Sequence, residues 1–277
     1  MISLILVALS TLLREVSDSV GKTRVQAKKQ GIYTSVFLST LVGGLIMFVL
    51  IFAGAPFVFQ VESLPYFIPR MILELLEAYL VIVAIVKADR STFGFLRLLT
   101  VPLLLVIDLT LLYTISFTQI IGIFTILCAL GVLLYAHKGA RKHAGLVIIT
   151  SLISVITISL YKYDITNFNS VVAEQSIFYV IMLLFFGIMA KYRHNENVFR
   201  LLRNPQALLQ SGSGGLAGVI ENFAYLYAPA SIILTMKRGL SILWSVLSGK
   251  KIFKETGIAL KLTLLLLVAV ALVLLVI

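Results

Sequence analysis

Two adjacent cations, Lys237 and Arg238, lie in the middle of the otherwise apolar stretch 227–248. Counted from Pro229 at ~1.5 Å per residue, the pair lies ~12–14 Å along a helix, close to the centre of a bilayer. A charge at that depth costs at least ~2.5–3.5 kcal/mol and usually faces a watery cavity or a partner. The pair therefore predicts an anion site at mid-membrane. The competing interpretation is a pair that snorkels to the interface or is neutralised by a buried glutamate, and that only holds helices together.

Further polar residues in apolar stretches are candidates for the same site. Arg97 would approach the cavity as a third cation, although a role as an interfacial anchor explains it equally well. Ser241 and Trp244 follow the cation pair on the same predicted helix, and Tyr79 and Tyr225 add polar rings. Arginine suits bidentate contacts to phosphate or carboxylate, and lysine acts as a point charge. We expect these residues, with the cation pair, to bind a small-molecule substrate.

Carboxylates also occur at membrane depth. Glu74 and Glu77 are three residues apart in one predicted helix, and Glu221 lies in another. One of them is expected either to carry a coupling proton or to neutralise the cation pair when the site is empty; fixed ion pairs that brace the bundle are an equal alternative. Arg14 and Asp18 are four residues apart and can pair on one helix face.

The composition indicates a chain that lies in lipid. Of the 277 residues, 60% are hydrophobic and 13% are charged, and the mean hydropathy is +1.06; soluble domains carry roughly 25% charged residues. The net charge of +11 is explained by orientation signals and anionic lipid headgroups, so the bilayer and not nucleic acid is the expected partner. The sequence lacks a metal-ligand His–Glu cluster, a G-x-S-x-G motif and a phosphate-binding G-x-x-x-x-G-K-[ST] loop. We therefore expect no metal, no cofactor and no enzyme activity, and we interpret Ser211 and Ser213, among the glycines Gly212, Gly214 and Gly215, as a flexible helix start.

Hydropathy predicts an all-α integral membrane protein with ten transmembrane helices. The run Ile2 to Leu13 lacks a basic region before it and small cleavage-site residues after it, so we expect it to be retained as part of the first span. The ten expected spans are residues 2–20, 32–53, 66–86, 91–112, 117–136, 143–161, 172–191, 207–227, 229–248 and 257–277.

A single shift of 140 residues superimposes the five early spans on the five late ones. The same shift places Arg97 on Lys237 and Lys22 on Lys162. A repeat with an odd number of spans must insert its second copy upside down. The sequence therefore predicts two inverted five-helix repeats, residues 1–138 and 139–277.

The loop charges agree with inversion. The connections that follow even-numbered spans hold only Arg70, at a helix edge, and Lys162. By the positive-inside rule the odd-numbered connections are cytoplasmic, which places both chain ends outside. Sixteen cations lie in the odd-numbered connections: Lys22, Arg24, Lys28, Lys29, Lys87, Arg90, Lys138, Arg141, Lys142, Lys191, Arg193, Arg200, Arg203, Lys250, Lys251 and Lys254.

The segment YLYAPASIILTMKRGLSILWSVLSGKKIFKETG and the ten-span pattern resemble the drug/metabolite transporter (DMT) superfamily, specifically its EamA-type members. The matching features are the alanines Ala224 and Ala228, Glu255 and Gly257 before the last span, and Pro102 in the first repeat. The adjacent Lys-Arg pair is also similar to the phosphate-binding pair of the plastid phosphate-translocator branch. The resemblance implies a secondary transporter of the cell inner membrane, and it implies cytoplasmic chain ends, opposite to the loop charges.

We therefore expect a multi-pass permease that moves a small anionic or zwitterionic metabolite by rocking its two repeats around a central site. Obligatory exchange and proton coupling both remain open, as do a monomer and a homodimer. The alternative is a non-transporting scaffold or a lipid-handling membrane protein, and an enzyme embedded in the membrane is the third and least favoured class.

Overall fold

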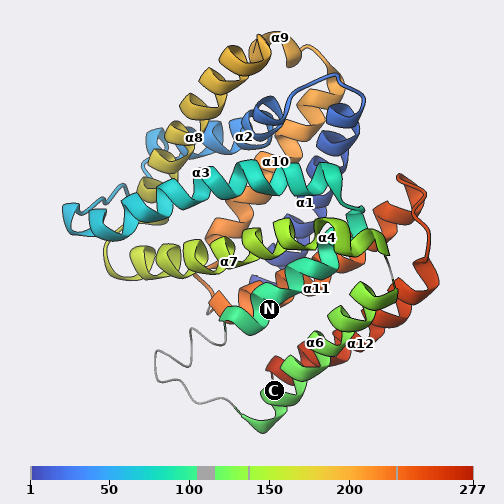
Figure 1. The fold of residues 1–277 in the computed structure, drawn as a ribbon. Helices are drawn as coiled ribbons and strands as arrows, with labels where there is room; N and C mark the ends of the chain where they lie inside the picture. Colours follow the sequence, from blue (N-terminus) through green and yellow to red (C-terminus); the bar gives the residue numbers. More distant parts are fainter. Residues whose placement is uncertain (1, 105–115, 137, 229, 277) are drawn as a thin grey trace.

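The structure is a computed structural model that describes residues 2–104, 116–136, 138–228 and 230–276 (Figure 1). Within these ranges the chain forms helices, turns and loops and no β-strand. The long helices are α1 (Ile2–Gln26), α2 (Ile32–Phe52), α3 (Leu64–Lys87), α6 (Phe117–Ala136), α7 (Lys138–Asn167), α8 (Val171–His194), α10 (Pro205–Ala224), α11 (Ala230–Lys251) and α12 (Ile258–Val276). The short ones are η1 (Val61–Ser63), α4 (Arg90–Leu96), η2 (Arg97–Leu99) and α9 (Val198–Leu201).

Five helices in the described part are long and apolar enough to cross a membrane. They are α2, α6, residues 144–167 of α7, α8 and residues 232–251 of α11. In α12 the apolar stretch 258–274 is slightly shorter. The helices α1, α3 and α10 carry the charged or small polar residues of the interior, which lowers their hydropathy. The chain is therefore a multi-pass helical membrane protein.

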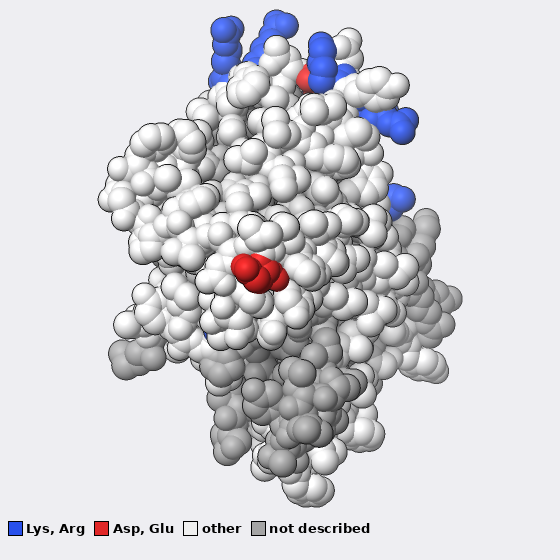
Figure 2. Space-filling view, turned by 90° about the vertical axis from the view of Figure 1, so that its left-hand side faces the viewer, with Lys and Arg blue, Asp and Glu red and all other residues white. Residues whose placement is uncertain are grey.

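Apolar side chains cover the outside of the bundle, and several charges lie within it. Phe48 and Leu266 are 58% and 69% exposed, whereas Arg70 and Arg238 are 3% and 5% exposed. Figure 2 shows one broad face with few charges and Lys and Arg gathered at its upper end, where Figure 1 places α9. This distribution suits a lipid environment, because a charge on the lipid side would lie in hydrocarbon.

Glycines let α10 approach its neighbours closely. The helix α10 packs against α1 and α2. A Cβ atom on Gly215 would lie 2.3 Å from the backbone nitrogen of Gly43 in α2, and one on Gly214 would lie 2.6 Å from the Ser17 hydroxyl in α1. Small residues commonly allow this contact between membrane helices. The expected flexible entry at Ser211 and Ser213 among these glycines is therefore wrong, because the segment lies inside α10 and Gly214 and Gly215 pack against α1 and α2.

The first half of the expected span 91–112 is helical but irregular. It begins as α4, tightens into the 3₁₀ turn η2 at Arg97 and continues as helix to residue 104; the remainder of the span lies outside the described residues. Pro102 has no N–H and cannot bond the carbonyl four residues earlier, which favours irregular geometry here. The turn places Arg97 in the interior at 7% exposure, so its interpretation as an interfacial anchor is wrong.

Candidate functional site

A central cavity of about 270 Å³ lies among helices α1, α2, α3, α4, α7, α8, α10 and α11. A space of this size and polarity can hold several water molecules. Ionisable groups concentrated inside an apolar bundle mark a functional site by default. The charged lining residues are Arg14, Glu15, Asp18, Arg70, Glu74, Glu77, Arg90, Arg97, Glu221, Lys237 and Arg238.

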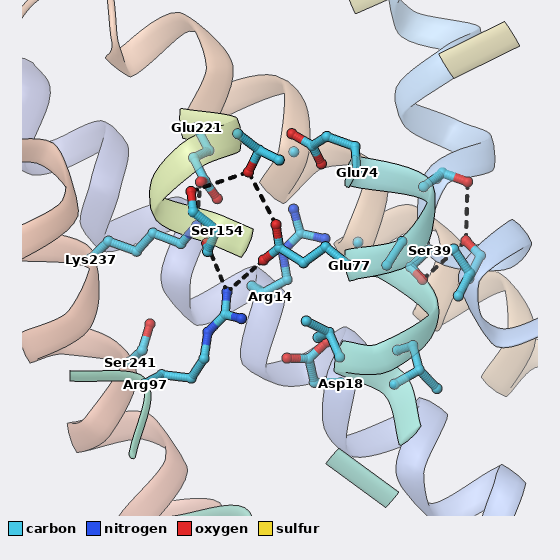
Figure 3. Close-up of a pocket in the computed structure, with 18 of the residues that line it drawn as sticks. Arg14, Asp18, Ser39, Glu74, Glu77, Arg97, Ser154, Glu221, Lys237 and Ser241 are labelled. Carbon is cyan, nitrogen blue, oxygen red and sulfur yellow. Dashed lines mark hydrogen bonds and ion pairs between the residues drawn. The ribbon is translucent and has the colours of Figure 1, made fainter. Parts of the chain in front are cut away.

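Lys237 is neutralised inside the cavity. The helix α11 carries Lys237 to the cavity wall, where its ammonium group forms an ion pair with Glu221 of α10 (Figure 3). The two side chains are 17% and 14% exposed. The Coulomb attraction within a buried ion pair offsets part of the solvation energy that both charges lose on burial. Glu221 is thus the buried carboxylate that neutralises one member of the cation pair.

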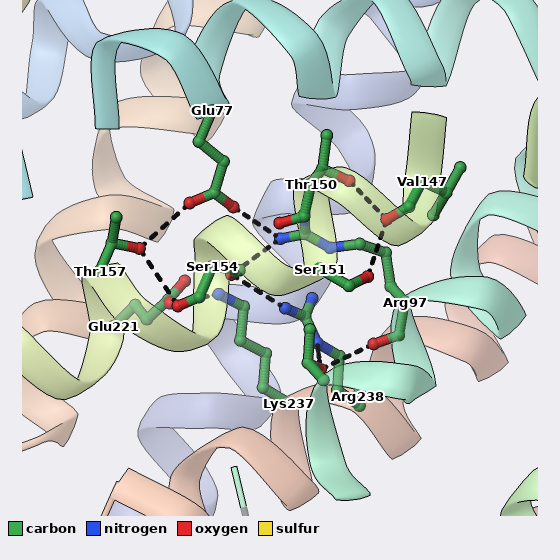
Figure 4. Close-up of polar contacts among 11 residues, drawn as sticks. Glu77, Arg97, Val147, Thr150, Ser151, Ser154, Thr157, Glu221, Lys237 and Arg238 are labelled. Atoms are coloured by element: carbon green, nitrogen blue, oxygen red, sulfur yellow. Dashed lines mark hydrogen bonds and ion pairs between the residues drawn. The ribbon is translucent and has the colours of Figure 1, made fainter. Parts of the chain in front are cut away.

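Arg97 and Glu77 form a second ion pair, braced by hydroxyl groups of α7 (Figure 4). Arg97 Nη2 lies 3.1 Å from Glu77 Oε1 and 3.2 Å from Ser154 Oγ. The other carboxylate oxygen of Glu77 accepts a hydrogen bond from Thr157 Oγ1 at 3.1 Å. The charges of Arg97 and Glu77 therefore balance each other within the protein.

Arg238 is bound differently, because its partners are neutral. Its Nε donates to Thr100 Oγ1 at 2.8 Å and its Nη2 donates to Ser154 Oγ at 3.4 Å. In the part of the chain that the structure describes, no carboxylate lies within ion-pair distance of Arg238. Hydroxyl groups satisfy donors without balancing a positive charge, so this guanidinium keeps a net charge at the cavity wall.

Arg14 is a functional candidate that the sequence prediction missed. Among the described residues it has neither a hydrogen bond nor an ion pair, and its expected partner Asp18 instead lies 2.7 Å from Arg90. The predicted Arg14–Asp18 pair is therefore wrong. Arg14 Nη2 lies 3.4 Å from the place where a Cβ atom on Gly218 would be, so the guanidinium lies against this part of α10. The position of Arg14 deep within the first expected span was the sequence feature that could have identified it as a site residue.

Arg90 holds two carboxylates at one end of the cavity. Its Nε lies 2.9 Å from Glu15 Oε1, and its Nη2 lies 2.7 Å from both Glu15 Oε2 and Asp18 Oδ2. Glu15 Oε1 also accepts a hydrogen bond from Ser248 of α11. The bidentate contact is geometrically specific. It ties α4, α1 and α11 together.

Arg70 also interacts with two carboxylates. It forms an ion pair with the fully buried Glu174 of α8, and its Nη2 lies 3.4 Å from Glu74 Oε1. The second oxygen of Glu74 has no hydrogen-bond partner in the described part, and its side chain is 23% exposed. Glu74 is therefore more open to a ligand than Glu77 or Glu221. Positive charge is in excess at Arg14 and Arg238, and negative charge is in excess near Arg70.

Outside the bilayer core, Glu255 fixes the loop between α11 and α12 through hydrogen bonds and an ion pair. Glu255 accepts hydrogen bonds from the Arg90 amide and from the Ser91 amide and hydroxyl, and Lys261 Nζ lies 3.1 Å away. Burial raises the pKa of Glu255, but the Ser91 hydrogen bond and the Lys261 charge outweigh burial and hold that pKa below its usual range. The Gly257 backbone, at φ +70°, then turns into α12.

Of the other residues predicted to bind substrate, some line the cavity and some do not. Ser241 lines the cavity, whereas Trp244, Tyr79 and Tyr225 lie outside its lining. Tyr79 stacks on Tyr33 with ring centroids 5.2 Å apart. Tyr225 packs edge-on against another tyrosine at 5.7 Å. Tyr79 and Tyr225 therefore pack against rings of neighbouring helices and do not line the cavity.

No family model matches the chain, and no curated protein sequence matches it. The geometry of the cavity is therefore the basis for inferring function.

Proposed function

We propose that the protein is a secondary-active carrier that moves a small anionic or zwitterionic metabolite by alternating access to the central cavity. The observation that carries the proposal is the pairing pattern inside the bundle. Lys237 and Arg97 each have a carboxylate partner, while Arg14 and Arg238 have none within the described ranges. An uncompensated cation in a membrane interior is costly, and a bound anion relieves that cost.

The proposed architecture is ten membrane spans in two inverted five-helix repeats, residues 1–138 and 139–277. The helix bounds support it. Adding 140 to the bounds of α2 gives 172–192, against Val171–His194 for α8, and adding it to α6 gives 257–276, against Ile258–Val276 for α12. The packing is also reciprocal, because α1 packs against α10 and its counterpart α7 packs against α3.

Two lysines related by the 140-residue shift support the internal repeat further. Lys22 Nζ donates to the carbonyl of Ala88, the C-cap of α3, at 2.6 Å. Lys162 Nζ donates to the carbonyl of Tyr225, the C-cap of α10, also at 2.6 Å. The 140-residue shift relates the two lysines and the two helices. Lysine interacts favourably with the free carbonyls at a helix C-terminus. Each half of the chain therefore contains the same kind of capping contact.

The substrate class follows from the size and charge of the cavity. At about 270 Å³ it lies just below the ~300–1,000 Å³ range of drug-sized pockets. The guanidinium groups of Arg14 and Arg238 suit a carboxylate or phosphate group. Glu74 is placed to meet a cationic group of a zwitterion. We propose a carrier of the DMT type in the cell inner membrane, without a cofactor and working as a monomer or homodimer.

The proposal is tested by ligand-dependent thermal stability of the purified protein in detergent. Glycerol 3-phosphate, succinate and glutamate are compared with choline. At 100 times its Kd, a ligand stabilises the folded state by about 2.7 kcal/mol. We expect the anions or the zwitterion to stabilise the protein, choline to have no effect, and the Arg14→Gln/Arg238→Gln double variant to lose the response. Arg193→Gln, which removes an exposed cation, is the matched control. Stabilisation that persists in the double variant would exclude this anion site.

Transport itself is measured in liposomes with the ligand that stabilises best. Obligatory exchange predicts uptake only into liposomes loaded with that ligand. Proton coupling predicts uptake into empty liposomes along a pH gradient, and a Glu74→Gln change should remove that dependence. Tight binding with no flux in either format would favour the scaffold alternative.

A further inference from the structure

A second polar depression of about 800 Å³ lies apart from the central cavity, beside α9. It is formed where the C-terminal end of α1, the connection after α8, and the start of α10 meet. Lys and Arg side chains gather at this end of the molecule (Figure 2). The lining residues are Arg24, Lys29, Asn195, Glu196, Asn197, Arg200, Leu201, Arg203, Asn204 and Pro205.

The depression carries excess positive charge. Its cations Lys29, Arg200 and Arg203 form no side-chain ion pair within the residues that the structure describes. The single lining carboxylate, Glu196, is already bound by the Gly31 amide at 3.0 Å and by a threonine hydroxyl. With Arg24 the lining holds four cations and one engaged carboxylate. It is therefore suited to an anionic group.

A buried arginine makes the depression a preformed site. Arg24 is 2% exposed, and its Nε and Nη1 are held by Gln30 Oε1 at 2.7 Å and Asn204 Oδ1 at 2.9 Å. Both contacts are to neutral amides, and Glu196 is the lining carboxylate that partly offsets the charge of Arg24. Asn204 also caps α10 by accepting from the Gln206 amide at 2.9 Å. The positive end of the α10 dipole thus adds to the potential of the site.

The surroundings place this site at a membrane–water boundary. Tyr192 and Phe199, which are near the lining residues in sequence, are 81% and 69% exposed, and Leu208 is 54% exposed in the first turns of α10. Aromatic rings and basic side chains at the ends of apolar helices are typical of the headgroup level. The lining is mostly polar and basic, and exposed apolar side chains follow or precede it in sequence on α8, α9 and α10. That combination fits a phosphodiester headgroup with attached acyl chains.

We propose that the depression at Arg24, Arg200 and Arg203 binds the phosphate of an anionic phospholipid headgroup. Basic pockets between membrane helices bind such headgroups. Free phosphate offers the same oxygen atoms but lacks acyl chains, which could contact exposed apolar side chains such as Phe199 and Leu208. This inference does not depend on transport by the central cavity.

The test uses the full-length protein in detergent, with lipid binding counted by native mass spectrometry. Short-chain phosphatidylglycerol is compared with phosphatidylcholine of the same chains and with glycerol 3-phosphate. The variant Arg200→Gln/Arg203→Gln changes two exposed side chains and should fold normally. The matched control is Lys250→Gln/Lys251→Gln, which removes two exposed cations from the end of α11.

Phosphatidylglycerol should bind wild type and the control alike, and at least ten-fold more tightly than phosphatidylcholine. Each basic side chain near an anionic headgroup contributes about a five-fold effect, so the Arg200/Arg203 variant should bind about thirty-fold more weakly. Equal binding of the two lipids, or an equal loss in the control, would overturn the proposal. Binding of glycerol 3-phosphate to this site as tight as that of the lipid would overturn the lipid assignment. A parallel assay of central-cavity ligands separates the two sites, because Arg200→Gln/Arg203→Gln should leave their binding unchanged.

Discussion

Removing an unpaired cation and removing a paired one should change stability in opposite directions. Arg14 has no partner among the described residues, whereas Arg97 holds Glu77 at 3.1 Å. In ligand-free protein, Arg14→Gln removes a cation that has no carboxylate within ion-pair distance among the described residues, so the melting temperature should rise. Arg97→Gln removes one partner of a buried pair and leaves the Glu77 carboxylate without its counter-ion, so the melting temperature should fall.

The magnitudes follow from burial. Arg97 and Glu77 are 7% and 8% exposed, and breaking a pair this buried costs about 3–5 kcal/mol. At roughly 2–4 °C per kcal/mol, Arg97→Gln should melt at least about 6 °C below wild type. Substitutions that relieve a destabilised functional site commonly add about 0.5–2 kcal/mol, so Arg14→Gln should melt about 1–8 °C above wild type.

The assay is a fluorescence thermal shift in one detergent, repeated with saturating ligand. Added ligand should raise the melting temperature of wild type and fail to raise that of Arg14→Gln, so the two proteins change order. Arg14→Lys keeps the charge and should retain part of the response. A fall in the melting temperature of ligand-free Arg14→Gln comparable to that of Arg97→Gln would refute the reasoning, because it would mean that Arg14 is structurally compensated.

Three further predictions concern other charged contacts. Lys237→Met should lower the melting temperature by leaving Glu221 unpaired, and adding Glu221→Gln should recover most of the loss; no recovery would contradict a coupled pair. Lys22→Met and Lys162→Met should each destabilise by about 1.5–3 kcal/mol through loss of a charged capping bond, and a clear difference in melting temperature between them would argue against equivalent caps. Glu255 has a folded-state pKa below its unfolded value, so its stabilisation is present at neutral pH and is lost as the pH falls through the folded-state pKa. The melting-temperature gap between wild type and Glu255→Gln should therefore shrink on acidification, and a gap independent of pH would contradict the assignment.

The sequence by itself determined the helical membrane class and the places of its helices. Hydropathy and helix formation are local properties, because a backbone in lipid must satisfy its own hydrogen bonds within each segment. The expected span 32–53 became α2 at Ile32–Phe52, and 117–136 became α6 with the same bounds. The depth of Lys237 along its helix likewise indicated a buried cation, which lies in the cavity with Glu221 as its partner.

Only the tertiary structure decided which charges pair. Asp18 is four residues from Arg14, and local spacing favours that pair. Instead, Arg90, which is 72 residues away in sequence, reaches Asp18 at 2.7 Å. The sequence also did not determine where Tyr79 and Tyr225 face, because a polar ring in an apolar span can face a cavity or another helix. Ion pairing and ring packing depend on which helices are neighbours and on how each helix is rotated about its axis. The periodicity of one helix specifies neither its neighbours nor its rotation. The unpaired charge of Arg14, on which the proposed function depends, is a property of the assembled bundle.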